Sequence, residues 1–171
     1  MSKRISVKKN NDVVKIEAPS DDSVRVCEEL KPCNPQKMAV FGSRSIFDCR
    51  AKILINETLH EYETINTIVT SQEPRGVCEV SQSVAKENNM ILELHFLNRS
   101  RYATGCFFNR SMSIINAADY VLLIHDGASK GTQNELEYTK KSGKPYKYVT
   151  MQPSNVYVDR YEGINCLKDE Q

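Results

Sequence analysis

The stretch YVLLIHDGASKGTQNELEY, residues 120–138, decides the fold of this chain. It begins with the apolar run YVLLI, which is typical of a strand that is buried on both faces of a sheet. A loop with two glycines, DGASKG, follows, and the residues from Thr132 onward have the spacing of a helix that ends at Gly143. The stretch therefore predicts a strand, a loop and a helix in immediate succession.

The same alternation extends through residues 38–150. Apolar or β-branched runs predict strands within residues 38–44, 65–71, 90–96, 120–126 and 144–150. Apolar side chains at helical spacing predict helices near residues 47–62, 77–85, 109–119 and 132–142. Strands that alternate with helices are joined by right-handed crossovers. We therefore expect an α/β fold with a mainly parallel sheet of five or more strands, covered by helices on both faces.

The two ends of the chain differ from this central region. In residues 1–37, RISVKK and VVKIEA alternate apolar and polar residues around NND, which indicates a β-hairpin or a loosely attached arm. The two prolines of KPCNPQK mark the boundary between this N-terminal extension and a single domain at residues 38–150. Residues 151–171 are expected to form a polar tail, in which VYV has the composition of an additional edge strand.

Composition narrows the functional classes. A net charge of +1 argues against nucleic-acid binding through a basic face. The first residues contain no apolar signal-peptide core and no run approaches the length of a membrane span, so no membrane partner is expected. The six cysteines contain no C-x-x-C pair and the three histidines are scattered, so neither a metal nor another cofactor is predicted. Scattered thiols without a secretory signal suit a reducing cytosol, and we expect a cytoplasmic protein.

Polar and small residues follow the predicted strands where a ligand is expected. In parallel α/β sheets, ligands bind beyond the carboxyl ends of the strands, near the point where the strand order reverses. Each of these segments, taken alone, is also explained by an ordinary turn or by a capped helix start. Helix capping, however, does not account for the three arginines that these segments contain. We therefore expect the turns to meet in one anion-binding pocket. The expected ligand-binding residues are Gly42, Ser43, Arg44, Arg75, Gly76, Asn109, Arg110, Asp126, Gly127, Ser129, Lys130, Gly131 and Thr132.

The loop DGASKGT has two interpretations. Its glycines let backbone amides approach a ligand, while Ser129 and Lys130 add a hydroxyl donor and a positive charge, which together make a phosphate cradle. Thr132-x-x-Glu135 is also a capping box, in which Thr132 caps the amide of Glu135 and Glu135 reaches back. The two interpretations are compatible, because a capped helix still offers its remaining amides.

Taken in order, the segments VFGSR, TSQEPRGV, NRSM, AADYVLLIHDGASKGTQNE and GKP resemble the SLOG superfamily over about residues 38–150. This group includes the Lonely Guy enzymes, the DprA proteins and the YspA-like proteins, and the DGASKGT loop is most similar to the YspA-like version. The resemblance implies a Rossmann-like three-layer sandwich that binds a nucleotide or an ADP-ribose-like ligand, often as a homodimer or a higher homo-oligomer.

Three functions remain open from this resemblance, and whether the protein is an enzyme is undecided. The first is binding, sensing or sequestration of a nucleotide-derived ligand. The second is hydrolysis of the N-glycosidic bond of a nucleoside monophosphate, as in the Lonely Guy enzymes, whose Gly-Thr-x-x-Glu motif matches Gly131, Thr132 and Glu135. Glu135 would then be the catalytic carboxylate, ionised because it lies near a helix N-terminus. The third, by similarity to DprA, is binding of single-stranded DNA.

Overall fold

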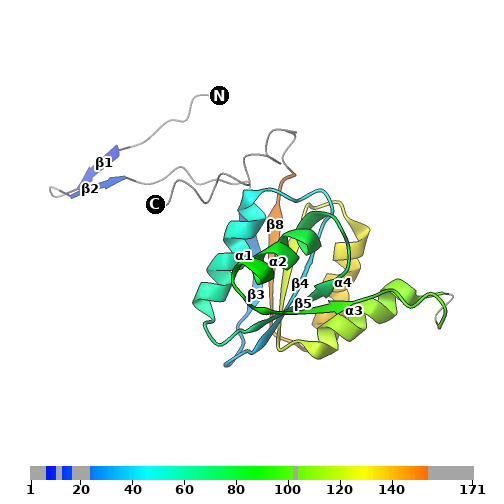
Figure 1. The fold of residues 1–171 in the computed structure, drawn as a ribbon. Helices are drawn as coiled ribbons and strands as arrows, with labels where there is room; N and C mark the ends of the chain where they lie inside the picture. The colour runs from blue at the N-terminus through cyan, green and yellow to red at the C-terminus, as the bar shows by residue number, and fades with distance from the viewer. Residues whose placement is uncertain (1–6, 11–12, 17–23, 102–103, 154–171) are drawn as a thin grey trace.

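The computed structural model describes residues 7–10, 13–16, 24–101 and 104–153 (Figure 1). Within them, six strands form one sheet in the order β3-β8-β7-β4-β5-β6. Strands β4 to β8 run parallel, whereas β3 pairs with β8 in the antiparallel direction at one edge. Their bounds are β3 (Val24–Leu30), β4 (Lys37–Gly42), β5 (Thr67–Ser71), β6 (Ile91–His95), β7 (Tyr120–His125) and β8 (Tyr146–Met151).

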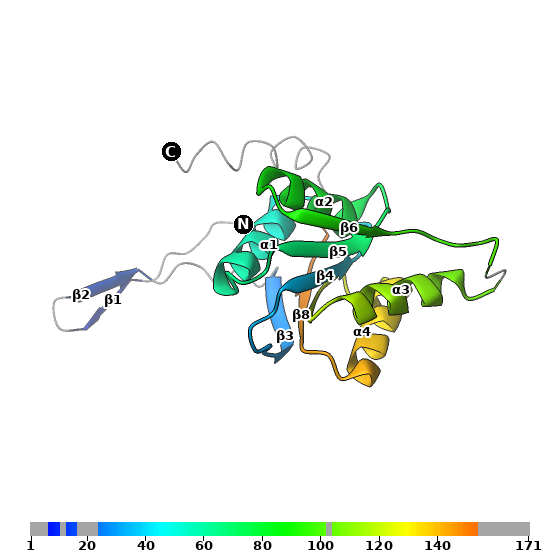
Figure 2. The same cartoon turned by 60° about the horizontal axis from the view of Figure 1, so that its bottom comes forward.

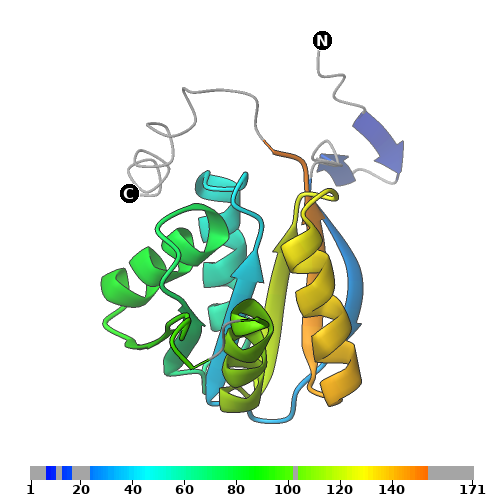
Figure 3. The ribbon, with the colours of Figure 1, turned by 90° about the vertical axis from the view of Figure 1, so that its right-hand side faces the viewer.

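Helices cover both faces of this sheet (Figure 2). On one face, α1 (Cys49–Glu61) and α2 (Gly76–Glu87) pack on side chains such as Met38, Ile68 and Leu122. On the other face, α3 (Cys106–Ala117) and α4 (Lys130–Ser142) pack on Val69 and Leu123, and both helices face the viewer in Figure 3. This arrangement confirms the predicted Rossmann-like three-layer sandwich. Across the described residues, no helix combines the length and apolar character needed to cross a bilayer.

Strand β3 is a feature that the sequence analysis did not predict. It lies inside the segment 1–37 that was expected to be an extension, yet it belongs to the main sheet through its pairing with β8. Separately, β1 (Val7–Asn10) and β2 (Val13–Ile16) pair as a two-stranded antiparallel sheet, where the sequence alternates around NND. The VYV sequence of the C-terminal tail lies outside the described residues.

The strand order reverses between β4 and β7. After β4 the chain proceeds to β5 and then β6 on one side, and it returns to the other side of β4 for β7 and β8. Gly42 ends β4 directly beside Ile124 of β7. A side chain at Gly42 would place its Cβ 2.4 Å from Val77, so glycine is needed for α2 to pack against the end of β4. The crevice at this reversal is the expected ligand position in such folds.

Candidate functional site

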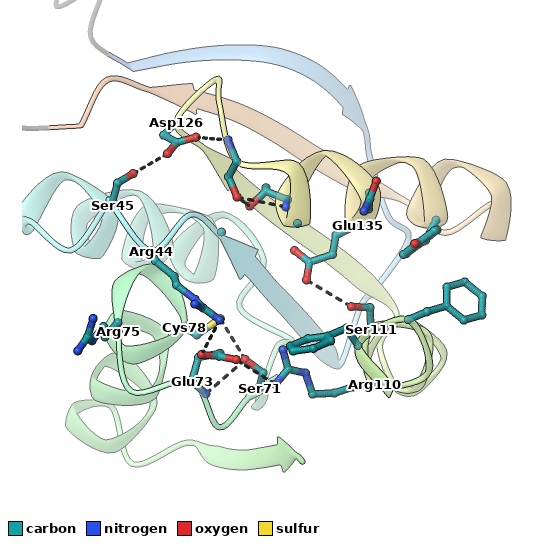
Figure 4. Close-up of a pocket in the computed structure, with 18 residues that line it drawn as sticks. Arg44, Ser45, Ser71, Glu73, Arg75, Cys78, Arg110, Ser111, Asp126 and Glu135 are labelled. Carbon is teal, nitrogen blue, oxygen red and sulfur yellow. Dashed lines mark hydrogen bonds and ion pairs between the residues drawn. The ribbon is translucent and has the colours of Figure 1, made fainter. Parts of the chain in front are cut away.

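A cavity of about 650 Å³ opens at the carboxyl ends of β4, β5 and β7, where the strand order reverses (Figure 4). Four helix-bearing connections contribute to its wall, because each parallel strand delivers its following turn to the same edge of the sheet. The lining residues are Gly42, Arg44, Ser45, Ser71, Glu73, Arg75, Cys78, Phe107, Phe108, Arg110, Ser111, Asp126, Ser129, Gly131, Thr132, Asn134, Glu135 and Tyr138.

The structure brings most of the predicted site residues together in this cavity. The predicted residues on its wall are Gly42, Arg44, Arg75, Arg110, Asp126, Ser129, Gly131, Thr132 and Glu135. Those that do not line it are Ser43, Gly76, Asn109, Gly127 and Lys130. The turns that follow the strands therefore meet at one cavity, although these five residues are not part of its wall.

Ser43 and Gly76 support the cavity from behind its wall. Ser43 is almost fully buried, and its Oγ accepts a hydrogen bond from the backbone amide of Asp126 at 3.0 Å. Gly76 has φ +68°, and a Cβ there would lie 2.4 Å from the Cα of Arg44. Both residues thus fix the backbone of the loops that carry Arg44 and Asp126. Gly127, in the loop before α4, and Lys130, the first residue of that helix, are exposed.

Asn109 was expected to begin a short helix, and this prediction is wrong. Helix α3 begins three residues earlier, at Cys106, and its N-cap is Gly105 with φ 76°. Asn109 lies in the first turn, where its Nδ2 donates to the carbonyl oxygen of Gly105 at 2.9 Å. Its side chain lines a second cavity, described below.

The start of α4 also differs from the predicted capping box. The N-cap is Ser129, whose Oγ accepts from the amide of Thr132 at 3.5 Å. Glu135 does not reach back to the cap, because it lies in the second turn and accepts from Ser111 Oγ at 3.3 Å. The first residues of the helix, Lys130 and Gly131, precede the first intrahelical bond, from Gln133 to Ser129, so their amides carry no intrahelical bond.

The carboxylate of Asp126 accepts hydrogen bonds from backbone amides of the loop that was predicted to bind a phosphate. Its Oδ1 accepts from the amides of Ala128 and Ser129 at 2.9 and 2.8 Å, and its Oδ2 accepts from Ser45 Oγ at 2.7 Å. Burial acts to raise the pKa of Asp126, but these hydrogen bonds outweigh it and lower the pKa to about 2. The carboxylate is therefore ionised, and the amides left for an external anion are those of Lys130 and Gly131.

Two of the three predicted arginines are held by a carboxylate that the sequence analysis did not select. Glu73 lies 3.3 Å from Arg44 and 3.2 Å from Arg110, from one oxygen to each (Figure 4). The Arg44 side chain is 67% exposed, whereas that of Arg110 is 10% exposed. Arg75 points away from Glu73, and within the described part of the chain its side chain has no ion-pair or hydrogen-bond partner. With Asp126 and Glu135, the cavity carries as many carboxylates as arginines.

Glu135 lies deep in the cavity and differs in ionisation from Asp126. Burial raises the pKa of its carboxyl to about 7, although the hydrogen bond from Ser111 and the charge of Arg110 oppose this shift. The expectation that Glu135 stays ionised near a helix N-terminus is therefore wrong. The residue is in the second turn, beyond the strongest effect of the helix dipole, and desolvation dominates. Near neutral pH it can both donate and accept a proton.

One side of the cavity is aromatic. Phe107 and Phe108 of α3 are about half exposed, and the ring of Phe108 meets that of Tyr138 edge-on at 4.9 Å. The guanidinium of Arg110 lies 5.6 Å from the ring centre of Phe107. This wall was not predicted, because the helix expected near residues 109–119 would begin after both phenylalanines. The signal was available, because Phe107, Phe108 and Ser111 fall on adjacent faces of a helix that begins at Cys106.

Comparison of the chain with protein-family models, with curated proteins and with solved structures gives no match. The fold and the cavity therefore define the class: an α/β protein of Rossmann-like architecture with a polar and aromatic cavity at the reversal of its strand order. Within the described ranges, no three His, Cys, Asp or Glu side chains form a group that could hold a metal ion.

Proposed function

We propose that the protein binds a nucleotide or a nucleotide-derived ligand in the 650 Å³ cavity. The observation that carries this proposal is the meeting of arginines, α4 N-terminal residues and an aromatic wall in one enclosure at the strand reversal. Its volume is within the range of about 300–1,000 Å³ that is usual for small-molecule sites. A nucleotide has a matching division into a charged end and a flat aromatic end.

The charged end of the ligand would lie between Arg44 and the start of α4. The amides of Lys130 and Gly131 carry no intrahelical bond, and the positive end of the helix dipole lies there. Arg44 is mostly exposed and joined only to Glu73 among the described residues, so it can turn toward a phosphate at small cost. The base would pack on Phe107 and Phe108, since a base stacked on an aromatic ring gains roughly 1–3 kcal/mol.

A hydrolase is the second candidate, favoured by the contrast between Asp126 and Glu135. Cleavage of an N-glycosidic bond needs one carboxylate that stabilises positive charge on the ribose and one acid that protonates the leaving base. A pKa of about 7 suits Glu135 to the acid role, and a pKa of about 2 keeps Asp126 ionised. This assignment reverses the role expected for Glu135 from the sequence.

The binding proposal is tested with a panel of nucleosides, nucleoside monophosphates, ADP-ribose, NAD and cyclic nucleotides. We expect at least one phosphate-bearing compound to bind in calorimetry and to be recovered intact in mass spectrometry after denaturation. Arg44→Met should weaken that binding by roughly tenfold or more, since a charge-assisted hydrogen bond is worth about 1.5–3 kcal/mol. Arg99→Met, at an exposed position outside the cavity, is the matched control. Equal losses in both variants, or no binding by any compound, would refute the proposal.

The hydrolase candidate is tested on the same panel by following release of the free base. We expect Glu135→Gln to abolish release while the intact nucleotide is still bound, because the amide cannot transfer a proton. Release that survives this substitution would remove Glu135 from the chemistry without affecting the binding proposal.

A further inference from the structure

A second cavity, of about 200 Å³, lies between α3 and the segment that follows β6. Its wall is formed by His95, Phe96, Asn98, Cys106, Asn109, Arg110 and Ser113. Only Arg110 is shared with the cavity described above. The nucleotide-binding proposal uses none of the other residues.

His95 connects a serine to a carboxylate at the wall of this cavity. Its Nδ1 lies 2.8 Å from Ser113 Oγ, and its Nε2 lies 2.9 Å from an oxygen of Glu93. The second oxygen of Glu93 accepts from Lys37 Nζ at 2.9 Å. The hydrogen bond from His95 and then that from Lys37 lower the pKa of Glu93, so the carboxylate is ionised and can only accept. The neutral imidazole therefore carries its hydrogen on Nε2 and presents the free lone pair of Nδ1 to the Ser113 hydroxyl.

We propose that Ser113, His95 and Glu93 form a second site, which transfers small acyl groups from esters to water. The three residues have the roles of nucleophile, general base and orienting carboxylate, which recur on unrelated folds and are recognised by geometry. In serine proteases Nε2 of the histidine faces the serine and Nδ1 faces the carboxylate, whereas here Nδ1 faces Ser113 and Nε2 faces Glu93. In both arrangements the proton passes from the serine to the histidine.

The reaction balances with water as its only co-substrate. Ser113 Oγ bonds to the carbonyl carbon of the ester as its proton passes to His95 Nδ1. The bond between that carbon and the alkoxy oxygen then breaks, and the alcohol leaves with the proton from Nδ1. A water oxygen next attacks the Ser113 acyl group, giving its proton to Nδ1. The carboxylic acid leaves as the proton returns to Ser113 Oγ.

Asn109 supplies a donor for the developing oxyanion. It lies one turn before Ser113 on the same face of α3, since residues four apart are neighbours on a helix, and both line the cavity. One hydrogen of its Nδ2 is used by the carbonyl oxygen of Gly105, at 2.9 Å, which leaves the second for a ligand. The volume of about 200 Å³ admits an acetyl group or another short acyl group.

The site is tested on the full chain with a fluorophosphonate probe and with p-nitrophenyl acetate. We expect labelling at Ser113, found by peptide mass spectrometry, and a burst of p-nitrophenol. Ser113→Ala should abolish both, and His95→Gln should slow both by about 10²-fold or more, as expected for loss of a general base. The matched controls are Ser83→Ala and His60→Gln, which change an exposed helical serine and an exposed helical histidine outside both cavities.

Several outcomes overturn this proposal. Absence of labelling in the unmodified protein does so, as does equal labelling of Ser113→Ala. Labelling of Ser113 that is unchanged in both His95→Gln and Glu93→Gln shows that the serine reacts without the relay. Thermal unfolding of each variant is measured in parallel. If the three residues only fasten α3 to the edge of the sheet, Ser113→Ala lowers the melting temperature and the unmodified protein remains unlabelled.

Discussion

The Glu73 carboxylate lies 3.2 Å from the Arg110 guanidinium, and its second oxygen lies 3.3 Å from Arg44. Arg44 lies in the turn that follows β4, whereas Arg110 lies in α3. Glu73 therefore joins two walls of the cavity. An anionic ligand that recruits either arginine must compete with this internal carboxylate. The charge of the cavity is consequently lower than the number of arginines in the sequence indicates.

Removing the charge of Glu73 should strengthen the binding of phosphate-bearing nucleotides. In Glu73→Gln both arginines lose their internal anion, and we expect affinity to rise by about tenfold, which corresponds to 1.4 kcal/mol. Titration calorimetry at low salt measures the change, with Glu79→Gln on the exposed side of α2 as the control. A loss of affinity in Glu73→Gln would instead mean that Glu73 contacts the ligand directly.

The ionisation of Glu135 should make stability depend on pH. Its pKa is raised from 4.5 to about 7 in the folded state, so the folded protein holds a proton that the unfolded chain has released between these values. The contribution of Glu135 to the free energy of unfolding should be fully present below pH 4.5 and fall as pH rises toward 7, by on the order of 2 kcal/mol. Urea denaturation at pH 5 and pH 8 measures this difference. The same pair of measurements on Glu135→Gln should show that this contribution has gone.

Asp126 should have the opposite pH dependence. Its pKa is lowered from 3.8 to about 2, so its contribution is present above pH 4 and is lost as pH falls from 4 to 2. Asp126→Asn should destabilise the fold by about 2 kcal/mol at neutral pH, because two amides lose a charged acceptor. It should also weaken nucleotide binding by loosening the loop before α4.

The control for this prediction is Asp119→Asn. Asp119 likewise accepts from two amides, those of Gln36 and Lys37 at 3.0 Å each, but it is not part of the cavity. Its variant should lose stability without losing ligand affinity. Equal losses of affinity in the two variants would contradict a specific role for the Asp126 loop.

Gly76→Ala should be strongly destabilising. The residue has φ +68°, and the new Cβ would meet backbone atoms of Arg44 and Ser43 at 2.4 and 2.5 Å, which cannot yield as a flexible side chain does. We expect a loss of at least 2 kcal/mol in denaturant unfolding, from strain and overpacking together. Gly131→Ala is the matched control, since its nearest atom would lie 3.9 Å away, and its unfolding free energy should change little. A tolerated Gly76→Ala would show that the two turns can separate.

The central strands could be predicted because their signal is local. All six residues of β7 are buried, as are all five of β5, and such burial favours the apolar and β-branched runs seen in the sequence. Strand β3 escaped prediction because it is an edge strand with Val26 and Leu30 about half exposed, so its residues do not alternate clearly. Its place in the sheet depends on pairing with β8, more than a hundred residues away along the chain.

The sequence predicted which turns form the candidate site better than it predicted the contacts of individual side chains there. The rule for parallel sheets correctly brought Arg44, Arg75 and Arg110 to one cavity. It could not reveal that Glu73 would neutralise two of them, because that contact joins residues from three turns. The pKa of Glu135 likewise depends on burial by neighbours that are distant in sequence. The starts of α3 and α4 were predicted too late, by three residues at Asn109 and by two at Thr132, since several nearby residues have cap-forming side chains.

The antiparallel direction of β3 has a practical consequence for attaching the molecule to a surface. Val24 begins β3 opposite Met151 at the end of β8, so the chain enters and leaves the six-stranded sheet at the same rim that holds the 650 Å³ cavity. A bead or dye fixed through residues near either position would crowd the mouth of that cavity. The exposed thiol of Cys33, between β3 and β4, lies toward the opposite rim. With Cys27 and Cys166 replaced by serine, it offers an anchoring point that leaves the entrance clear.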